Sequence, residues 1–255
     1  MVQRLESLHR AGVRQLPKVA VAPPAEAEPP PAATPAPVET HEAPHAIDAR
    51  HNLFEEDLKM SRKASTTRDE RIEALSALDA EVKQCTQCFE LASTRTQTVF
   101  GVGNPQARIV FFGEAPGADE DRQGEPFVGR AGKLLDKIIE ACSFRRQDVY
   151  IMNVLKCRPP NNADPVAEQV EACRHFLMAQ LVILRPKVIV TLGRHSLNLL
   201  ISPDLRITKI RGQHIKKNGQ LYLPTYHPAM ILRNPRLEPE FRHDLAKAKA
   251  LSERT

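Results

Sequence analysis

The carboxylates of one loop stand out because the chain as a whole is basic, with a formal net charge of +5. The loop follows the apolar run RIVFFG (108–113) and places acids among glycines and prolines. These acids are Glu114, Asp119, Glu120, Asp121 and Glu125. A phosphate-binding loop is one alternative, but phosphate calls for backbone N–H groups and a lysine where this loop carries acids. The acids are therefore the candidate chemical groups of this segment.

Four of the five cysteines are candidate metal ligands. Cys85 and Cys88 form a C-x2-C pair, and Cys157 and Cys173 flank later elements that a compact α/β domain can fold back onto that pair. Four thiolates bind either zinc or an iron–sulfur cluster, and the spacing by itself leaves both open. Cys142 lies beside the apolar face of a predicted helix, where a small buried hydrophobe is the favoured interpretation.

Strands and helices alternate along the second part of the chain. Continuous apolar runs predict buried strands over residues 108–114, 148–156, 187–193 and 220–228. Helical spacing predicts helices over residues 69–85, 129–142, 165–185, 195–201 and 238–254, with Asp164 as the N-cap of the third. This alternation indicates an α/β fold with a parallel sheet covered on both faces. Ligands of such sheets bind at the carboxyl ends of the strands, so the segments after each strand are expected to carry the site.

Composition separates the two ends of the chain. Residues 17–44 hold nine of the 21 prolines and no aromatic residue, which predicts a disordered linker. We expect an N-terminal extension over residues 1–68, with a short basic amphipathic stretch at its start, and an ordered domain over residues 69–255. Residues 200–255 contain eleven Lys/Arg and five Asp/Glu, an excess that suits either a solvated surface or a phosphate backbone.

Five motifs, in order, resemble those of the iron–sulfur uracil-DNA glycosylases of the family-4 type. They are the CTQC helix end, GNPQARIVFFGEAPGADED (103–121), PFVGRAGKLL (126–135), NVLKCRPPNN (153–162) and TYHPAMILRNP (225–235). The likeness covers roughly residues 70–250 and leaves the first 68 residues outside. It implies an α/β/α sandwich around a four-stranded parallel sheet. The implied activity is a DNA repair reaction that hydrolyses the N-glycosidic bond of uracil and leaves an abasic site.

The resemblance also decides between the two metals. It implies that a [4Fe–4S] cluster is held by Cys85, Cys88, Cys157 and Cys173. In this family the cluster is structural, and it pins loops that present DNA-contacting residues. A cluster of this kind needs a reducing cytoplasm for its assembly, so a cytoplasmic protein is expected.

The resemblance assigns roles to the residues that follow the strands. Glu114 is expected to lie against the flipped base and the attacking water, either as a general base or in positioning that water, and its neighbours Gly113 and Ala115 are expected to bind the substrate. Glu120 is expected to approach C5 of uracil, where the methyl group of thymine would collide with it. An acidic loop also suits the cationic sugar of the transition state.

The remaining implied contacts hold the uracil ring itself. Phe127 is expected to stack on the ring, and Asn153 to pair with O4 and N3–H. His227 is expected to donate to O2 as the bond breaks. Glu114, Asn153 and His227 are the predicted catalytic residues.

DNA contacts are expected from the basic C-terminal region. Ile231, with Met230 and Leu232, is a candidate wedge that fills the gap left by the flipped base. Phosphate contacts are expected from Arg233 and Arg211, and also from Lys209, Lys216, Lys217 and Arg236. An alternative function is a sensor that traps uracil-DNA covalently, for which His214 in RGQHIKK (211–217) is the candidate nucleophile.

The expected partner is uracil-containing DNA, either single- or double-stranded, and no membrane. No run of 18 apolar residues is present that could span a bilayer. We expect a monomer, with the N-terminal extension as a candidate tether for a repair or replication protein.

Overall fold

The computed structural model describes residues 67–254 of the chain. The predicted N-terminal extension covers residues 1–68, and its first 66 residues, with the amphipathic start and the linker, lie outside the described part. The first described helix, α3 (Arg68–Gln84), starts within one residue of the predicted start of the domain.

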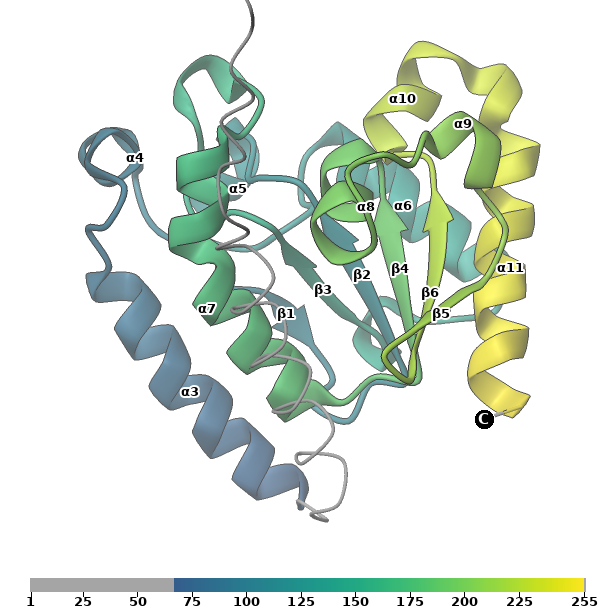
Figure 1. The fold of residues 1–255 in the computed structure, drawn as a ribbon, viewed down its shortest axis with the longest axis horizontal. Helices are drawn as coiled ribbons and strands as arrows, with labels where there is room; N and C mark the ends of the chain where they lie inside the picture. The colour runs from purple at the N-terminus through teal and green to yellow at the C-terminus, as the bar shows by residue number, and fades with distance from the viewer. Residues whose placement is uncertain (1–66, 255) are drawn as a thin grey trace, which may run out of the picture. The chain divides into compact units, whose positions relative to one another are not determined.

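A six-stranded sheet forms the centre of the described residues, in the order β1-β3-β2-β4-β6-β5 (Figure 1). Its inner strands run parallel, as predicted: β3 (Tyr150–Asn153), β2 (Ile109–Gly113), β4 (Val188–Leu192) and β6 (Gln220–Thr225). The edge strands β1 (Val102–Gly103) and β5 (Ile215–Lys217) pair antiparallel with β3 and β6. The predicted parallel sheet is confirmed, and two short edge strands extend it.

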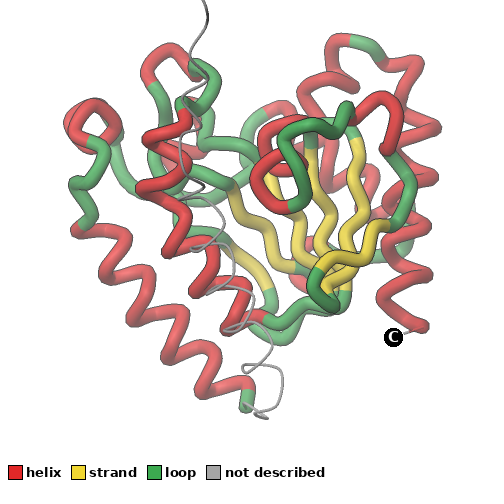
Figure 2. Tube along the Cα trace, in the orientation of Figure 1, coloured by secondary structure: helices red, strands yellow, loops and turns green. Residues whose placement is uncertain are grey.

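Alternate residues of each strand serve opposite faces of the sheet. On β2, Val110 and Phe112 enter one core, whereas Ile109 and Phe111 enter the other. The first core is covered by α3, α4 (Phe89–Thr94), α7 (Ala167–Leu184) and α8 (Arg194–Leu200). The second is covered by α6 (Arg130–Ala141), α10 (Pro228–Arg233) and α11 (Glu238–Arg254). Figure 2 shows the strands between these two helical layers, which confirms the three-layer prediction.

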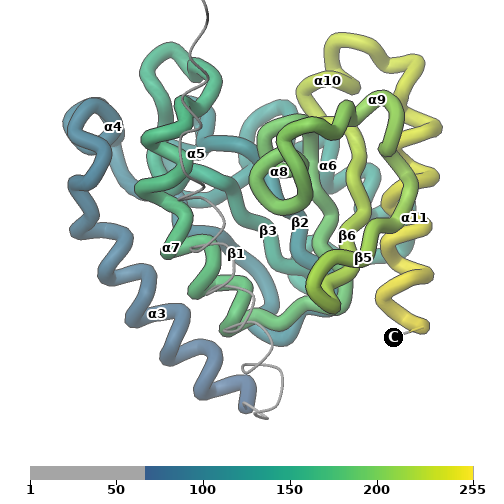
Figure 3. Tube along the Cα trace, in the orientation of Figure 1, coloured from purple at the N-terminus to yellow at the C-terminus, as the bar shows by residue number. Residues whose placement is uncertain are grey.

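The shorter elements connect the strands to these layers, and the chain can be followed through them in Figure 3. They are α5 (Ala118–Gln123), α9 (Ile207–Ile210), and the 3-10 turns Arg146–Asp148, Pro160–Asn162 and Pro235–Leu237. None of the helices among residues 67–254 is both long enough and apolar enough to cross a membrane.

The start of α7 differs from the prediction. The helix begins at Ala167, and Val166 is its N-cap residue, with the Gln169 side chain accepting from the Val166 N–H. The prediction of Asp164 as N-cap is therefore wrong. The helix begins two residues later than predicted, and the Asp164 carboxylate binds Arg194 at 2.8 Å in place of the N–H groups of the first helical turn.

The carboxyl ends of the inner strands lie at one edge of the sheet. The register aligns Gly113 of β2 with Asn153 of β3, and Leu192 of β4 with Thr225 of β6. The residues that follow the four strands therefore leave from the same edge: Glu114, Val154, Gly193 and Tyr226. This edge is where the sequence places the candidate site.

Candidate functional site

A cavity of about 470 Å³ opens at the carboxyl ends of the inner strands. It is lined by residues from each segment in which the sequence analysis expects the site, except the one after β4. The predicted residues on its wall are Glu114, Ala115, Glu120, Phe127, Asn153, His227 and Arg233. Residues far apart in the sequence are thus brought together as predicted, although their individual roles remain predictions.

Asn153 supplies a buried polar group to this cavity. The residue is 2% exposed, and its Oδ1 has no hydrogen-bond partner among the described residues. A buried acceptor left without a donor costs about 1–3 kcal/mol. The cost is removed if a ligand in the cavity donates a hydrogen bond to Oδ1, so the atom marks a position where an N–H group of a ligand is expected.

Gly113 makes room for Asn153 and Phe127. A Cβ at residue 113 would lie 2.6 Å from the Phe127 ring and closer still to Asn153 Oδ1. Gly113 therefore does not need to touch a ligand to matter, because its missing side chain lets these two residues meet over the end of β2.

The Gly113→Ala variant is expected to lose about 10²-fold in substrate turnover, because the added methyl group displaces both Asn153 and Phe127 by a sizeable fraction of an ångström. Overpacking of this kind also costs about 1–3 kcal/mol of stability. Single-turnover kinetics and a thermal melt measure the two effects separately. A folded variant with the wild-type rate would contradict the role given to this glycine.

Phe127 is held in an unusual conformation. Its φ is +54°, a region that non-glycine residues occupy at a cost, and its ring lies 5.6 Å from the ring of His227. Glu120 fixes the following turn, since its Oε1 accepts from the N–H groups of Val128 and Gly129, each at 2.9 Å. Its Oε2 accepts from Gly117 N at 3.1 Å. Glu120 therefore both lines the cavity and holds the aromatic loop in place.

His227 presents a defined tautomer to the cavity. Its Nδ1 accepts a hydrogen bond from Ala229 N at 3.2 Å, at the start of α10. Burial lowers the pKa of His227 to about 4, although the nearby carboxylates of Glu114 and Glu120 act in the opposite direction. The ring is therefore neutral near pH 7, and its proton is on Nε2 because Nδ1 is the acceptor. A neutral N–H donor results.

Glu114 has a partner that the sequence analysis missed. Nδ1 of His195 lies 2.6 Å from Glu114 Oε2, and this buried Nδ1 makes no well-aligned hydrogen bond within the described part of the chain. On the other side of the ring, Arg194 Nη2 lies 3.1 Å from His195 Nε2 and 2.8 Å from Asp164 Oδ2. The sequence predicts a strand over residues 187–193 and functional residues after it, but nothing in the segment distinguishes His195 from a structural histidine.

Glu114, Asp164 and His195 place their ligand-type atoms within 4.8 Å of one another. A divalent ion is nevertheless disfavoured there, because the Arg194 guanidinium already contacts both Asp164 and His195. Its positive charge takes the place that a metal would need. The cluster is better described as an ion-pair network at the wall of the cavity.

The four predicted cysteine ligands line a second, small and enclosed cavity. Cys85 and Cys88 lie between α3 and α4, Cys157 follows β3, and Cys173 lies in α7. Burial raises the pKa of Cys173 to about 11, and burial also raises the pKa of Cys88 and Cys157, with neighbouring cysteines adding to the effect. Thiols gathered in this way become thiolates when a cationic centre compensates their charge.

The four cysteines share one small cavity, and thiolate ligands of this kind bind either zinc or an iron–sulfur cluster. Arg95 Nη1 also donates to Cys157 Sγ at 2.9 Å, as expected beside a negatively charged group.

Cys142 stands apart from these four. It is the C-cap of α6 and packs in the second core, where its thiol contacts Arg242 O at 3.5 Å. The interpretation of Cys142 as a small buried hydrophobe agrees with this position.

The residues expected at the DNA surface are not equally available. Arg233 lines the first cavity, but Ile231 is 1% exposed and packs in the core. A buried side chain is not presented to DNA, so the expectation for Ile231 needs correction. Its neighbour Leu232 is 43% exposed and is the better candidate for a wedge. The helical turn of α10 explains the difference, because adjacent residues on a helix face different directions.

Arg211 is engaged within the fold. Its guanidinium donates to Asp244 at 2.6 Å and to Glu240 O at 3.0 Å, and it stacks over Tyr226 at 5.3 Å. Contact of Arg211 with DNA stays a prediction. In such a contact the guanidinium would bind a phosphate group while it is also bonded to Asp244 and Glu240. His214 is exposed and does not line the cavity.

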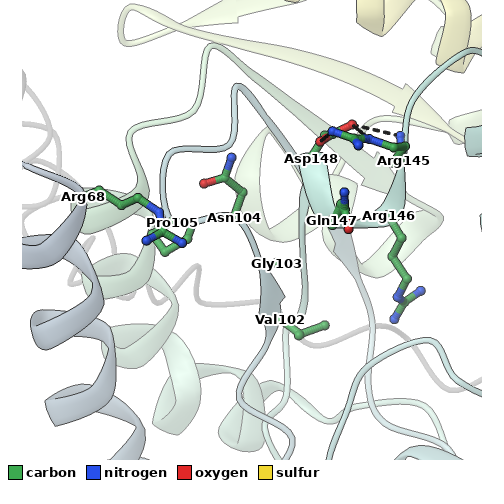
Figure 4. A pocket seen from close by; sticks show the side chains of 9 residues that line it. All are labelled: Arg68, Val102, Gly103, Asn104, Pro105, Arg145, Arg146, Gln147 and Asp148. Carbon is green, nitrogen blue, oxygen red and sulfur yellow. Dashed lines mark hydrogen bonds and ion pairs between the residues drawn. The ribbon is translucent and has the colours of Figure 1, made fainter.

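A further cavity, of about 660 Å³, lies at the opposite ends of the strands (Figure 4). Its walls come from Val102–Pro105 and Arg145–Asp148, which precede β2 and β3, and from Arg68. Figure 4 shows the guanidinium of Arg145 bonded to Asp148, and Arg146 is bonded to Asp136 and to Pro126 O. These charges are therefore used within the fold, and the smaller cavity at the carboxyl ends is the candidate site.

Comparison with known proteins adds an independent observation. A sequence model of the Uracil DNA glycosylase superfamily matches residues 100–250. The chain is 47% identical to the Type-4 uracil-DNA glycosylase of Thermotoga maritima, over 72% of this chain and 96% of that protein. It is 46% identical to the Type-4 uracil-DNA glycosylase of Archaeoglobus fulgidus, over 69% of this chain and 92% of that protein. The chain is also 34% identical to a Type-5 uracil-DNA glycosylase from Thermus thermophilus, over 40% of this chain and 53% of that protein.

Proposed function

The chain belongs to the uracil-DNA glycosylase superfamily, and from this premise we propose that it hydrolyses the N-glycosidic bond of uracil in DNA. The product is an abasic site, the first intermediate of base excision repair. Within the structure, one observation supports this proposal most: the Asn153 carboxamide is buried beside a cavity at the strand ends, and no described residue donates to its Oδ1. The substrate atom cannot be reached inside a duplex, so the uracil must be flipped into the cavity.

Recognition of uracil is assigned to Asn153, Phe127 and Glu120. The Asn153 side chain offers an acceptor for uracil N3–H and a donor for O4, whereas cytosine presents the opposite pattern. Phe127 provides an aromatic face for stacking. Glu120 limits the space beside C5, and its three backbone hydrogen bonds keep it in place against the methyl group of thymine.

Bond breaking leaves a cationic sugar and a uracil anion, and the site supplies groups for both. The neutral Nε2–H of His227 donates to uracil O2, where the negative charge develops. The Glu114 carboxylate stabilises the positive sugar and orients the attacking water. Neither residue needs to form a covalent bond to the DNA.

The neutral state of His227 leads to a test by NMR. With its pKa lowered to about 4, the ring is expected to stay neutral, with Nε2 protonated, down to about pH 5, whereas an unperturbed histidine titrates near about 6.5. Because the unfolded chain takes up this proton and the folded chain does not, stability falls as the pH drops from about 6.5 towards 4. Nitrogen-labelled histidine, with His227→Gln to assign the signals, measures the tautomer directly. Titration of His227 near pH 6.5 would contradict the effect of burial on its pKa and the neutral donor assigned to it below that pH.

We assign Cys85, Cys88, Cys157 and Cys173 to a [4Fe–4S] cluster, supported by their common cavity and by the motifs that the chain shares with the iron–sulfur uracil-DNA glycosylases. When bound, the cluster supplies a cross-link between α3, α7 and the loop after β3. That loop begins directly after Asn153, and the buried Lys156 amine donates to Asn153 O at 3.1 Å. The cluster thus supports the strand end that reads the base. Assembly of such a cluster favours a reducing compartment such as the cytoplasm.

Contact with DNA is assigned to the exposed surface beside the cavity. Arg233 and Arg236 follow Leu232 at the end of α10, so basic groups flank an exposed apolar side chain. This combination suits a wedge in the base stack with phosphate contacts around it. The domain is expected to act as a monomer, and the N-terminal extension remains a candidate tether for a protein partner.

The function is tested with single-stranded and duplex oligonucleotides that carry one uracil, with thymine and cytosine versions as controls. Alkali cleavage after incubation, resolved on a denaturing gel, should cut only the uracil strand. A shifted band that persists under denaturing conditions would instead indicate covalent trapping. That alternative is not favoured, because His214 lies outside the cavity. An uncut and unshifted uracil strand would contradict the proposed activity.

A further inference from the structure

We propose that His195 is a positioning residue for the reaction, holding the Glu114 carboxylate in the orientation that directs water at the sugar. The inference rests on the proposed function and assigns a role within the same site. It starts from the 2.6 Å distance between His195 Nδ1 and Glu114 Oε2, which belong to two partly buried side chains, of which Glu114 lines the cavity.

The fold brings these two residues together from neighbouring strands. β2 and β4 pair in parallel, so Glu114, directly after β2, and His195, three residues after β4, leave the same edge of the sheet. Gly193 turns the chain from β4 into α8 with a φ of +91°, which glycine adopts without strain. The backbone of Glu114 is fixed as well, because its carbonyl accepts from Leu155 N at 3.0 Å.

Arg194 decides which ring nitrogen carries the proton. Its Nη2 lies 3.1 Å from His195 Nε2 and can only donate, because a guanidinium has no acceptor. Nε2 is therefore the acceptor, and the proton of the neutral ring is on Nδ1, facing Glu114. Asp164 holds Arg194 in this place through a 2.8 Å ion pair. Arg194 thus donates both to Asp164 and to His195 Nε2. The Nδ1–H of His195 in turn faces the Glu114 carboxylate.

The two carboxylate oxygens of Glu114 therefore have different roles. Oε2 is engaged by the His195 ring, so Oε1 is the oxygen that remains for a water molecule. The ring and the carboxylate are close but not well aligned in the free protein, and catalytic hydrogen bonds commonly tighten only when substrate binds. His195 itself does not line the cavity, which separates positioning from contact with the base.

A double-mutant cycle tests this role. His195→Leu is expected to lower the single-turnover rate of uracil release about 10²-fold, a typical result of misplacing a reacting group. Affinity for uracil-containing DNA should change less than about twofold, because His195 does not line the cavity. In a Glu114→Gln background, the same His195→Leu change should cost less than about twofold, because the carboxylate it positions is gone.

A conservative variant separates positioning from folding. His195→Asn keeps an N–H donor close to the place of Nδ1 and is expected to recover most of the lost rate. His243→Leu, an exposed histidine on α11, is the matched control and should keep the wild-type rate. Equal rate losses from His195→Leu with and without the Glu114 carboxylate, or an unchanged rate in the single variant, would overturn the proposal. Failure of the wild-type protein to release uracil would instead reject the proposed function, so the two failures are distinguishable.

Discussion

The Asn153→Leu variant is expected to lose about 10²–10³-fold in the single-turnover rate of uracil release, the usual effect of removing one preorganised polar group from a catalytic site. Leucine has nearly the shape of asparagine but neither its acceptor nor its donors. The buried Oδ1 that lacks a partner disappears, so the folded protein should be as stable as the wild type or slightly more stable. Rate and stability should therefore move in different directions, which a purely structural asparagine would not produce.

Asn198 provides the matched control for this variant. Its Oδ1 is also buried without a hydrogen-bond partner among residues 67–254, but Asn198 lies in α8 and does not line the cavity. Asn198→Leu should keep the wild-type rate of uracil release. If Asn153→Leu were equally active, the buried carboxamide would not be the reader of the base, and the assignment of uracil N3–H to its Oδ1 would fail.

The Cys173→Ser variant is expected to lose the bound cluster, and with it several kcal/mol of folding free energy, because metal binding and folding are coupled. Cys173 projects from α7, so the proposed cluster would tie this helix to the C-x2-C turn after α3. Wild-type protein should be brown and contain about four iron atoms per chain. The variant should be pale, with substoichiometric iron and a lower melting temperature.

Cys142→Ser is the control, because it makes the same substitution at a buried cysteine that is not one of the four predicted ligands. It should retain the colour and the iron of the wild type. Zinc in place of iron in the wild-type protein, or full iron content in Cys173→Ser, would show that the four cysteines do not hold this cluster. The activity assay is not needed for this decision.

The parallel sheet could be predicted because its strands are buried on both faces and read as continuous apolar runs, such as Ile109–Gly113 and Val188–Leu192. The two edge strands could not be predicted, because a strand of two or three residues is too short to show a pattern of alternating apolar residues. The second edge strand, Ile215–Lys217, is also mostly charged. The error at Asp164 has a similar origin. A short polar residue before a proline suits both an N-cap and a loop, and only the packing of α7 distinguishes them.

The candidate site divides in the same way. Glu114, Phe127, Asn153 and His227 follow strands or lie in recognisable motifs, so their meeting at one edge could be expected. His195 could not, because a histidine within a short apolar helix carries no signal until its distance to Glu114 is known. The sequence also does not tell which apolar side chains are exposed. Ile231 and Leu232 are adjacent and chemically alike, yet only Leu232 reaches the surface.

The short edge strands have a consequence for how the domain meets other molecules. Extended peptides often bind by adding a strand to an exposed sheet edge, where a row of backbone groups is free to pair. Here the edges are formed by Val102–Gly103, only two residues long, and by Ile215–Lys217, which carries two lysines. Such edges offer little length for strand addition, so a protein that recruits this domain must recognise its helices and loops, or a segment outside the sheet altogether.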